Sequence, residues 1–108
     1  MISICIPAYN ATGKEHTEDY NNITMLEDLF SSIEKQTYKD YEVIVSDHSE
    51  NDDVWQLWTI WKDRINMKYY PYNQKRGSCE ANLNHAISKA KGNYIKPMLQ
   101  DDYFTSAD

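Results

Sequence analysis

The chain has 108 residues, which is enough for one domain with a modest core and too few for two. Hydrophobic residues make up 41% and charged residues 26%, a balance that excludes a disordered or fibrous protein. The formal net charge of −6 disfavours nonspecific binding to nucleic acid or anionic membranes, because both require a basic surface. A nucleotide could still bind through a metal ion.

The sequence begins with a predicted strand over residues 2–7, which is rich in β-branched apolar side chains and suits the centre of a sheet. Residues 8–23 are polar and aperiodic, which predicts a long loop. A helix should start at Thr24, where the Thr24 hydroxyl and the Glu27 carboxylate form a capping box, and should end near Gln36.

The next predicted strand runs from Tyr41 to Asp47, and its central residues are continuously apolar, as expected for a parallel strand covered on both faces. Asp52 can cap a second helix, which is followed by a strand from Met67 to Tyr72. A third helix carries Cys79 on its apolar face, and Gly92 is expected to end it in a left-handed conformation.

The fourth predicted strand lies within residues 92–99 and is expected to be buried. The alternation of strands and helices predicts an α/β fold, a three-layer Rossmann-like unit with a mainly parallel sheet of about four strands. There is no apolar stretch of membrane-spanning length and no signal peptide. We therefore expect a protein of the reducing cytoplasm, free or at the inner face of a membrane, with Cys5 and Cys79 as buried thiols.

Chemically distinctive residues follow three of the strands: Pro7-Ala8-Tyr9-Asn10, Asp47-His48-Ser49 and Asp101-Asp102. The carboxyl ends of parallel strands share one rim, where open α/β sheets bind ligands. Tyr9 could stack on a base, Asp47 could accept hydrogen bonds from base N–H groups, and Asp102 could hold a metal that bridges two phosphates. Hard oxygen ligands of this kind suit Mg²⁺ or Mn²⁺.

Each of these residues also has a simpler interpretation. Tyr9 is equally typical of a half-buried aromatic at the rim of a sheet. Asp47 alone is typical of a turn or a helix cap, and Asp101-Asp102 alone of a solvated turn after a strand. The order and spacing of the motifs must therefore decide between these interpretations.

Four motifs in order resemble the N-terminal half of an inverting family 2 glycosyltransferase of GT-A fold. They are Ser3-Ile-Cys-Ile-Pro-Ala-Tyr-Asn10, Ser31-Ser-Ile-Glu-Lys-Gln-Thr-Tyr38, Tyr41-Glu-Val-Ile-Val-Ser-Asp-His-Ser49, and Gly92-Asn-Tyr-Ile with Gln100-Asp-Asp102. The resemblance spans nearly the whole chain and implies the nucleotide-binding half of a GT-A domain.

The resemblance also implies a nucleotide-sugar donor, commonly a UDP-sugar, bound through Mg²⁺ or Mn²⁺. The residues after the first strand, from Pro7 through Ala8 and Tyr9 to Asn10, would contact the nucleotide, and Asp47 would bind its base. Asp102 would be the metal ligand, and Asp101 would lie near the ribose or the metal. Metal coordination would stabilise the diphosphate as a leaving group.

The chain departs from the family pattern at three places. Leu83-Asn84 stands where many members have Arg-Asn, and Ser46-Asp47-His48 stands where Asp-Asp is usual. The first acid of the Asp-x-Asp segment is replaced by Leu99 or Gln100, depending on the alignment. The resemblance places the general base and the acceptor-selecting residues after this segment, so we assign no general base.

Because only six residues follow Asp102, we expect a truncated half with its acceptor, a saccharide or a lipid-linked saccharide, unidentified. Uncovered apolar surface predicts a homo-oligomer. The alternative function is a non-catalytic module that keeps only the nucleotide site. A phospho-receiver with Asp47 as acceptor is a third possibility, but it would need an acidic pair after the first strand, where Pro7-Ala-Tyr-Asn10 stands.

Overall fold

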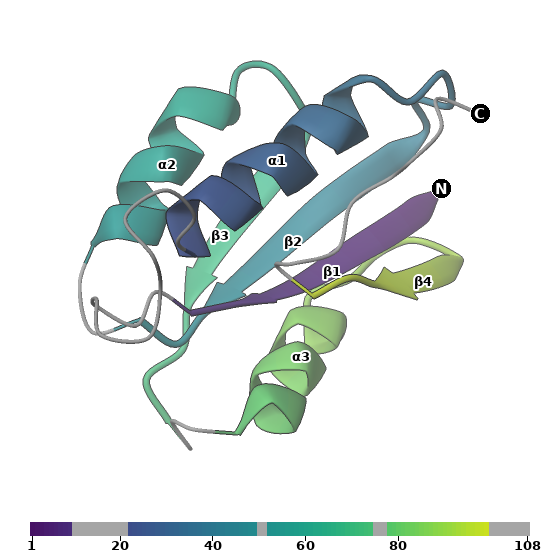
Figure 1. Ribbon diagram of the computed structural model, residues 1–108. Coiled ribbons are helices and arrows are strands. Elements are labelled where there is room, and N and C mark those ends of the chain that lie inside the picture. Colours follow the sequence, from purple (N-terminus) through teal and green to yellow (C-terminus); the bar gives the residue numbers. More distant parts are fainter. Residues whose placement is uncertain (10–21, 50–51, 75–77, 100–108) are drawn as a thin grey trace.

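The computed structural model of the chain describes residues 1–9, 22–49, 52–74 and 78–99. Within these ranges strands and helices alternate along the chain, as Figure 1 shows. The elements are β1 (Ile2–Ala8), α1 (Asn22–Glu34), β2 (Tyr41–Asp47), α2 (Asp53–Trp61), β3 (Met67–Pro71), α3 (Cys79–Ser88) and β4 (Tyr94–Pro97).

The four described strands form one parallel sheet in the order β3-β2-β1-β4. Helices α1 and α2 cover one face and α3 covers the other (Figure 1), which confirms the predicted three-layer α/β fold. In the sheet register Ala8 lies beside Asp47, and Asp47 lies beside Pro71. The carboxyl ends of β1, β2 and β3 therefore meet at one rim.

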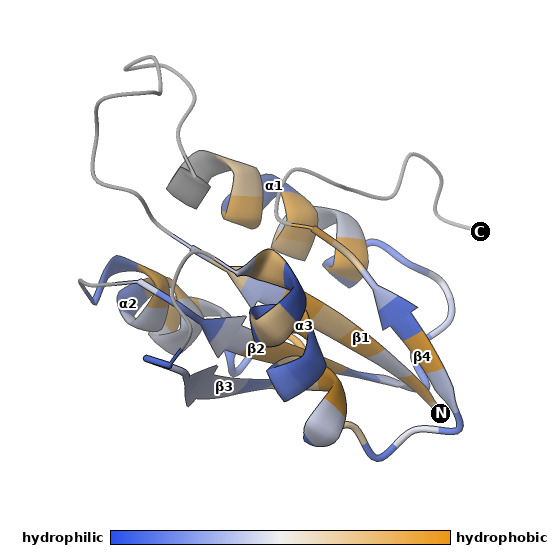
Figure 2. Ribbon diagram, turned by 90° about the horizontal axis from the view of Figure 1, so that it is seen from below, coloured by the Kyte–Doolittle hydropathy of each residue, from blue (hydrophilic) through white to orange (hydrophobic). Residues whose placement is uncertain are grey.

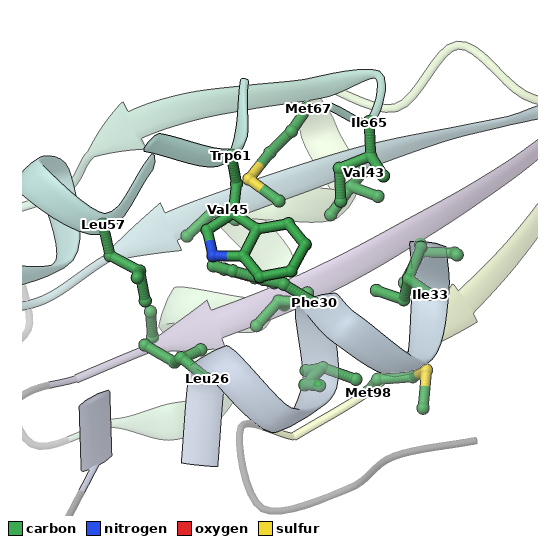
Figure 3. Packing of buried hydrophobic residues seen from close by; sticks show 14 of the residues in the cluster. Leu26, Phe30, Ile33, Val43, Val45, Leu57, Trp61, Ile65, Met67 and Met98 are labelled. Atoms are coloured by element: carbon green, nitrogen blue, oxygen red, sulfur yellow. The ribbon is translucent and has the colours of Figure 1, made fainter. Parts of the chain in front are cut away.

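The larger part of the core lies between the sheet and the pair α1 and α2. Phe30 of α1 meets Trp61 of α2 edge to face, with ring centroids 5.9 Å apart and planes at 65°. Figure 3 shows these two rings among labelled side chains from β2, α1 and α2. Each fully buried side chain of this size contributes roughly 1.5–3 kcal/mol to folding. Packing on this face therefore stabilises the sheet whose strand ends form the rim.

The opposite face is packed more thinly. Cys5, Ile44 and Ala86 form its buried cluster, and Leu83 and Ile87 of α3 pack against them. Figure 2, viewed toward α3, shows this helix lying over the strongly hydrophobic β1. Cys5 is buried, as predicted. Burial, with a smaller effect of the Glu42 carboxylate, raises the pKa of its thiol to about 11.

Gly92 has a different role from the one predicted. Helix α3 ends at Ser88, and the φ of Gly92 lies outside the left-handed region, so this glycine is not the helix terminus. A Cβ at this position would lie 2.6 Å from both the Met1 carbonyl oxygen and Ser3 Oγ. Glycine is therefore required because the chain passes directly against β1.

Three further expectations are corrected by the structure. Helix α1 begins at Asn22, so Thr24 lies within the helix and is not its N-cap. Cys79 is exposed and not buried, at the first residue of α3. All four residues of β4, which pairs only with β1 among the described strands and lies at the sheet edge, are exposed.

A helix must be long and apolar to span a membrane. Among the described residues, no helix combines the length and the apolar content that a membrane span needs.

Candidate functional site

The backbone carbonyl oxygen of Ala8 connects three elements at the rim. It accepts a hydrogen bond from the His48 backbone N–H at 3.0 Å and another from Asn82 Nδ2 at 3.1 Å. The first bond joins the ends of β1 and β2, and the second joins the end of β1 to the first turn of α3. Ala8 itself is fully buried, so it serves the site through its backbone.

Asp47 ends β2 and is only 4% exposed. Its Oδ1 accepts the Ser49 backbone N–H at 2.9 Å, and its Oδ2 accepts the Tyr69 hydroxyl. Burial raises the pKa of Tyr69, and the hydrogen bond to Asp47 raises it further, so the phenol remains a hydrogen-bond donor. A carboxylate has about four lone-pair positions, so these two hydrogen bonds leave room for further donors. The expected contact of Asp47 with a base stays a prediction.

His48 is also buried, at 3% exposure, and its Nε2 lies 2.9 Å from the Gln74 carbonyl oxygen. A carbonyl only accepts, so Nε2 carries the proton. The ring stacks on Tyr72 with centroids 5.1 Å apart, and Tyr72 stacks on His85 with centroids 4.2 Å apart. His85 Nδ1 lies 2.7 Å from Ser46 Oγ, which anchors the far end of this three-ring stack to β2.

A cavity of about 250 Å³ opens at the rim. Pockets for drug-sized ligands occupy roughly 300–1,000 Å³, so this cavity fits one part of such a ligand, for example a nucleoside. It is bordered by the end of β1, the residue after β2 and the first turn of α3. The described lining residues are Pro7, Tyr9, His48, Cys79 and Asn82.

The predicted site residues are distributed unequally over this geometry. Pro7 and Tyr9 line the cavity, and the 45% exposed Tyr9 presents an aromatic surface there. Asn10, Asp101 and Asp102 lie outside the described residues. Within the described ranges, no group of three or more His, Cys, Asp or Glu side chains could hold a metal ion. The metal site at Asp101 and Asp102 therefore stays a prediction.

A family model described as glycosyl transferase family 2 matches residues 3–107. This chain belongs to glycosyl transferase family 2. The family predicted from the four motifs is thereby confirmed.

Two curated bacterial glucosyltransferases are similar to this chain. The GalNAc(5)-diNAcBac-PP-undecaprenol beta-1,3-glucosyltransferase of Campylobacter jejuni is 30% identical over 88 residues, which cover 81% of this chain and 28% of that protein. The UDP-Glc:alpha-D-GlcNAc-diphosphoundecaprenol beta-1,3-glucosyltransferase of Escherichia coli is 30% identical over 109 residues, covering 98% of this chain and 37% of that protein. The chain thus spans about a third of the length of these relatives.

A solved structure has the same fold as this chain. The crystal structure of residues 1–349 of S. aureus TarS in complex with UDP-GlcNAc has a TM-score of 0.74 and 25% identity, and the match covers 94% of this chain and 27% of that chain. The same protein in complex with UDP has a TM-score of 0.75 and 26% identity. These similarities confirm the predicted GT-A, Rossmann-like architecture.

The family motifs did not identify three of the described residues that line the cavity, namely His48, Cys79 and Asn82. His48 directly follows Asp47, and only the side-chain geometry shows that it, rather than Asp47, borders the cavity. Asn82 lies in helical register with Cys79 and Ala86, at spacings of three and four. A polar residue on that apolar face was the available signal for Asn82.

Proposed function

We propose that this chain is the nucleotide-sugar-binding part of a glycosyltransferase that transfers a sugar from a nucleotide diphosphate sugar, with a UDP-sugar as the expected donor and inversion at the transferred carbon. The cavity between Tyr9 and Asn82, at the carboxyl ends of β1 and β2, carries this proposal. Membership of the family and the UDP and UDP-GlcNAc complexes of TarS support it.

The cavity offers a nucleoside the surfaces that it needs. Pro7 and the Tyr9 ring provide apolar contact, against which a flat base can pack. His48 and Asn82 provide polar groups on the other walls, and both are held in place by hydrogen bonds to backbone carbonyls. An apolar surface with a few fixed polar groups is typical of a small-molecule site.

Asp101 and Asp102 are the residues that would hold Mg²⁺ or Mn²⁺ in this proposal. Adjacent carboxylates are a suitable set of hard oxygen ligands. The backbone N–H of Met98 donates to the Cys5 carbonyl at 3.0 Å, so the chain that leads to these two residues runs along β1 in the direction of the rim. The ion would neutralise charge on the diphosphate leaving group when bound.

The acceptor proposed here is a lipid-linked saccharide, and the process is the synthesis of a polysaccharide or oligosaccharide. The two curated relatives support this part, since both are named for undecaprenol-linked diphosphate sugars as acceptors. A cytoplasmic protein that works at the inner face of a membrane fits such an acceptor.

Calorimetric titration of UDP, with and without Mn²⁺, tests the proposal. We expect binding that depends on the metal and that is lost in Asp102→Asn. Asp63→Asn, in the exposed turn after α2, removes the same charge away from the rim and should bind as the unchanged chain does. Equal binding by Asp102→Asn and Asp63→Asn would contradict the metal assignment.

The alternative is a non-catalytic module that retains the nucleotide site. It predicts the same UDP titration but neither transfer nor hydrolysis of a UDP-sugar. Release of UDP from radiolabelled UDP-glucose or UDP-GlcNAc, measured with a membrane extract as the source of acceptor, separates the two functions. Release that requires Asp102 would exclude the non-catalytic module.

A further inference from the structure

Asn82 is buried at 2% exposure and borders the rim cavity. Its orientation is fixed by one contact, the hydrogen bond from Nδ2 to the Ala8 carbonyl oxygen at 3.1 Å. Because a carbonyl can only accept, the nitrogen of the carboxamide must face Ala8 and the oxygen must face away from it. The carboxamide is thus held with its acceptor atom in a defined direction.

Among the described residues, that acceptor has no hydrogen-bond partner. Within the described part of the chain, Asn82 Oδ1 is the buried side-chain oxygen or nitrogen atom that receives no hydrogen bond. Buried polar atoms are almost always paired, and an unpaired one costs about 1–3 kcal/mol. By contrast, the neighbouring buried carboxylate of Asp47 has a donor on each oxygen. An unpaired acceptor beside a cavity indicates a missing hydrogen-bond donor that a ligand would supply.

We propose that Asn82 selects the ligand by accepting, at Oδ1, a hydrogen bond from an N–H or O–H group of the bound nucleoside. The assignment rests on the proposed function, since that function places a nucleoside in the cavity. A uracil N3–H and a ribose hydroxyl are both donors of the required kind. A ligand without the donor would leave Oδ1 buried and unpaired, which is the condition under which a polar site discriminates strongly.

The first test changes the ligand and leaves the chain unchanged. UDP is titrated in parallel with N3-methyl-UDP, 2′-deoxy-UDP and 3′-deoxy-UDP, each of which lacks one candidate hydrogen-bond donor. We expect one analogue to bind about tenfold more weakly or worse, which corresponds to the loss of a hydrogen bond to a buried group. The identity of that analogue tells the base from the ribose as the source of the donor.

The second test assigns the loss to Asn82. Asn82→Leu has a similar branched shape without the acceptor, and Asn84→Leu is the matched control on the exposed side of the same helix. The analogue that binds weakly to the unchanged chain should bind Asn82→Leu as UDP does, to within about a factor of two. The discrimination should persist in Asn84→Leu.

A spectroscopic measurement covers the case in which Asn82→Leu fails to fold. The ¹³C resonance of the Asn82 side-chain carbonyl is followed in the unchanged chain with Mg²⁺, on addition of UDP and then of the weak analogue. Acceptance of a hydrogen bond shifts this resonance, so we expect a shift with UDP that the analogue does not produce.

The outcomes separate this proposal from the proposed function. If UDP and all three analogues bind the chain with equal affinity, the role of Asn82 is overturned and the nucleotide site remains. The same holds if UDP binds and the Asn82 carbonyl resonance does not move. Failure of UDP to bind the unchanged chain would contradict the proposed function itself, and the assignment of Asn82 with it.

Discussion

The Tyr69 hydroxyl of β3 donates a hydrogen bond to the Asp47 carboxylate at the end of β2. Ser49 supplies a second hydrogen bond to the same carboxylate from the backbone that follows the strand. A carboxylate that is 4% exposed needs such partners, because an unpaired buried charge is costly. Asp47 therefore fixes the turn that carries His48 into the wall of the cavity.

Tyr69→Phe should lower the free energy of unfolding by about 1–2 kcal/mol, since one oxygen of a buried carboxylate loses its donor. Urea unfolding followed by circular dichroism measures the change. Tyr94→Phe removes a hydroxyl from a side chain that is 72% exposed and should change stability by less than about 0.5 kcal/mol. Equal stability of Tyr69→Phe and the unchanged chain would show that this hydrogen bond does not hold the rim.

The architecture could be predicted from the sequence because apolar runs and helical spacing alternate clearly. Residues 41–47 were bounded correctly as a parallel strand, since their continuous apolar centre is typical of a strand covered on both faces. The exposure of β4 could not be predicted in this way. Its residues resemble those of a buried strand, and only the strand order places it at the edge of the described sheet.

Gly92→Ala should destabilise the fold by about 1–3 kcal/mol, the range for overpacking a rigid site. The added Cβ would lie 2.6 Å from Ser3 Oγ, which bonds both the Gly92 backbone N–H and the buried Glu42. Lys91→Ala is the matched control, because Lys91 is exposed and uses only its backbone N–H to reach Glu42. A fully stable Gly92→Ala would contradict the close approach to β1.

Acid should destabilise the chain through His85. Burial lowers the pKa of His85, and the nearby charges of Lys89 and His48 lower it further, so the folded state favours the neutral ring. An imidazole in the unfolded chain titrates near 6.5. The contribution of His85 to stability is therefore complete above about pH 6.5 and decreases as the pH falls below that value.

Urea midpoints at about pH 7.5 and about pH 5 test this dependence in the unchanged chain and in His85→Gln. The midpoint of the unchanged chain should fall further on acidification than that of the variant. The lower pH stays above 4.5, the ordinary pKa of a Glu side chain, and the pKa of Glu42 lies below that value. Burial alone would raise the pKa of Glu42, but the hydrogen bonds from Ser3 and the Lys91 backbone lower it. An equal decrease of the urea midpoint in the unchanged chain and in His85→Gln would exclude His85 as the source of the acid sensitivity.

The candidate site was predictable to the level of strand ends but not of side chains. Pro7 and Tyr9 line the cavity, because they lie at the carboxyl end of a central parallel strand, and their contact with a nucleotide stays a prediction. Which of Asp47 and His48 borders the cavity depends on the hydrogen bonds from Tyr69 and Ser49, which come from a different strand and from a turn. The Tyr69 bond joins residues 22 positions apart, so it leaves no local pattern in the sequence.

The exposed edge of β4 should cause the chain to self-associate. Tyr94 is 72% and Ile95 is 40% exposed, and an edge strand with apolar side chains is a template for pairing with another copy. Sedimentation or light scattering across a concentration series should show a rising average mass that Ile95→Lys abolishes, because a charge on the edge opposes pairing. Ile60→Lys places the same charge on the outer face of α2, at a residue 62% exposed, and should leave the association unchanged. A single monomeric species at every concentration would contradict the predicted homo-oligomer, and equal loss in both variants would move the contact away from β4.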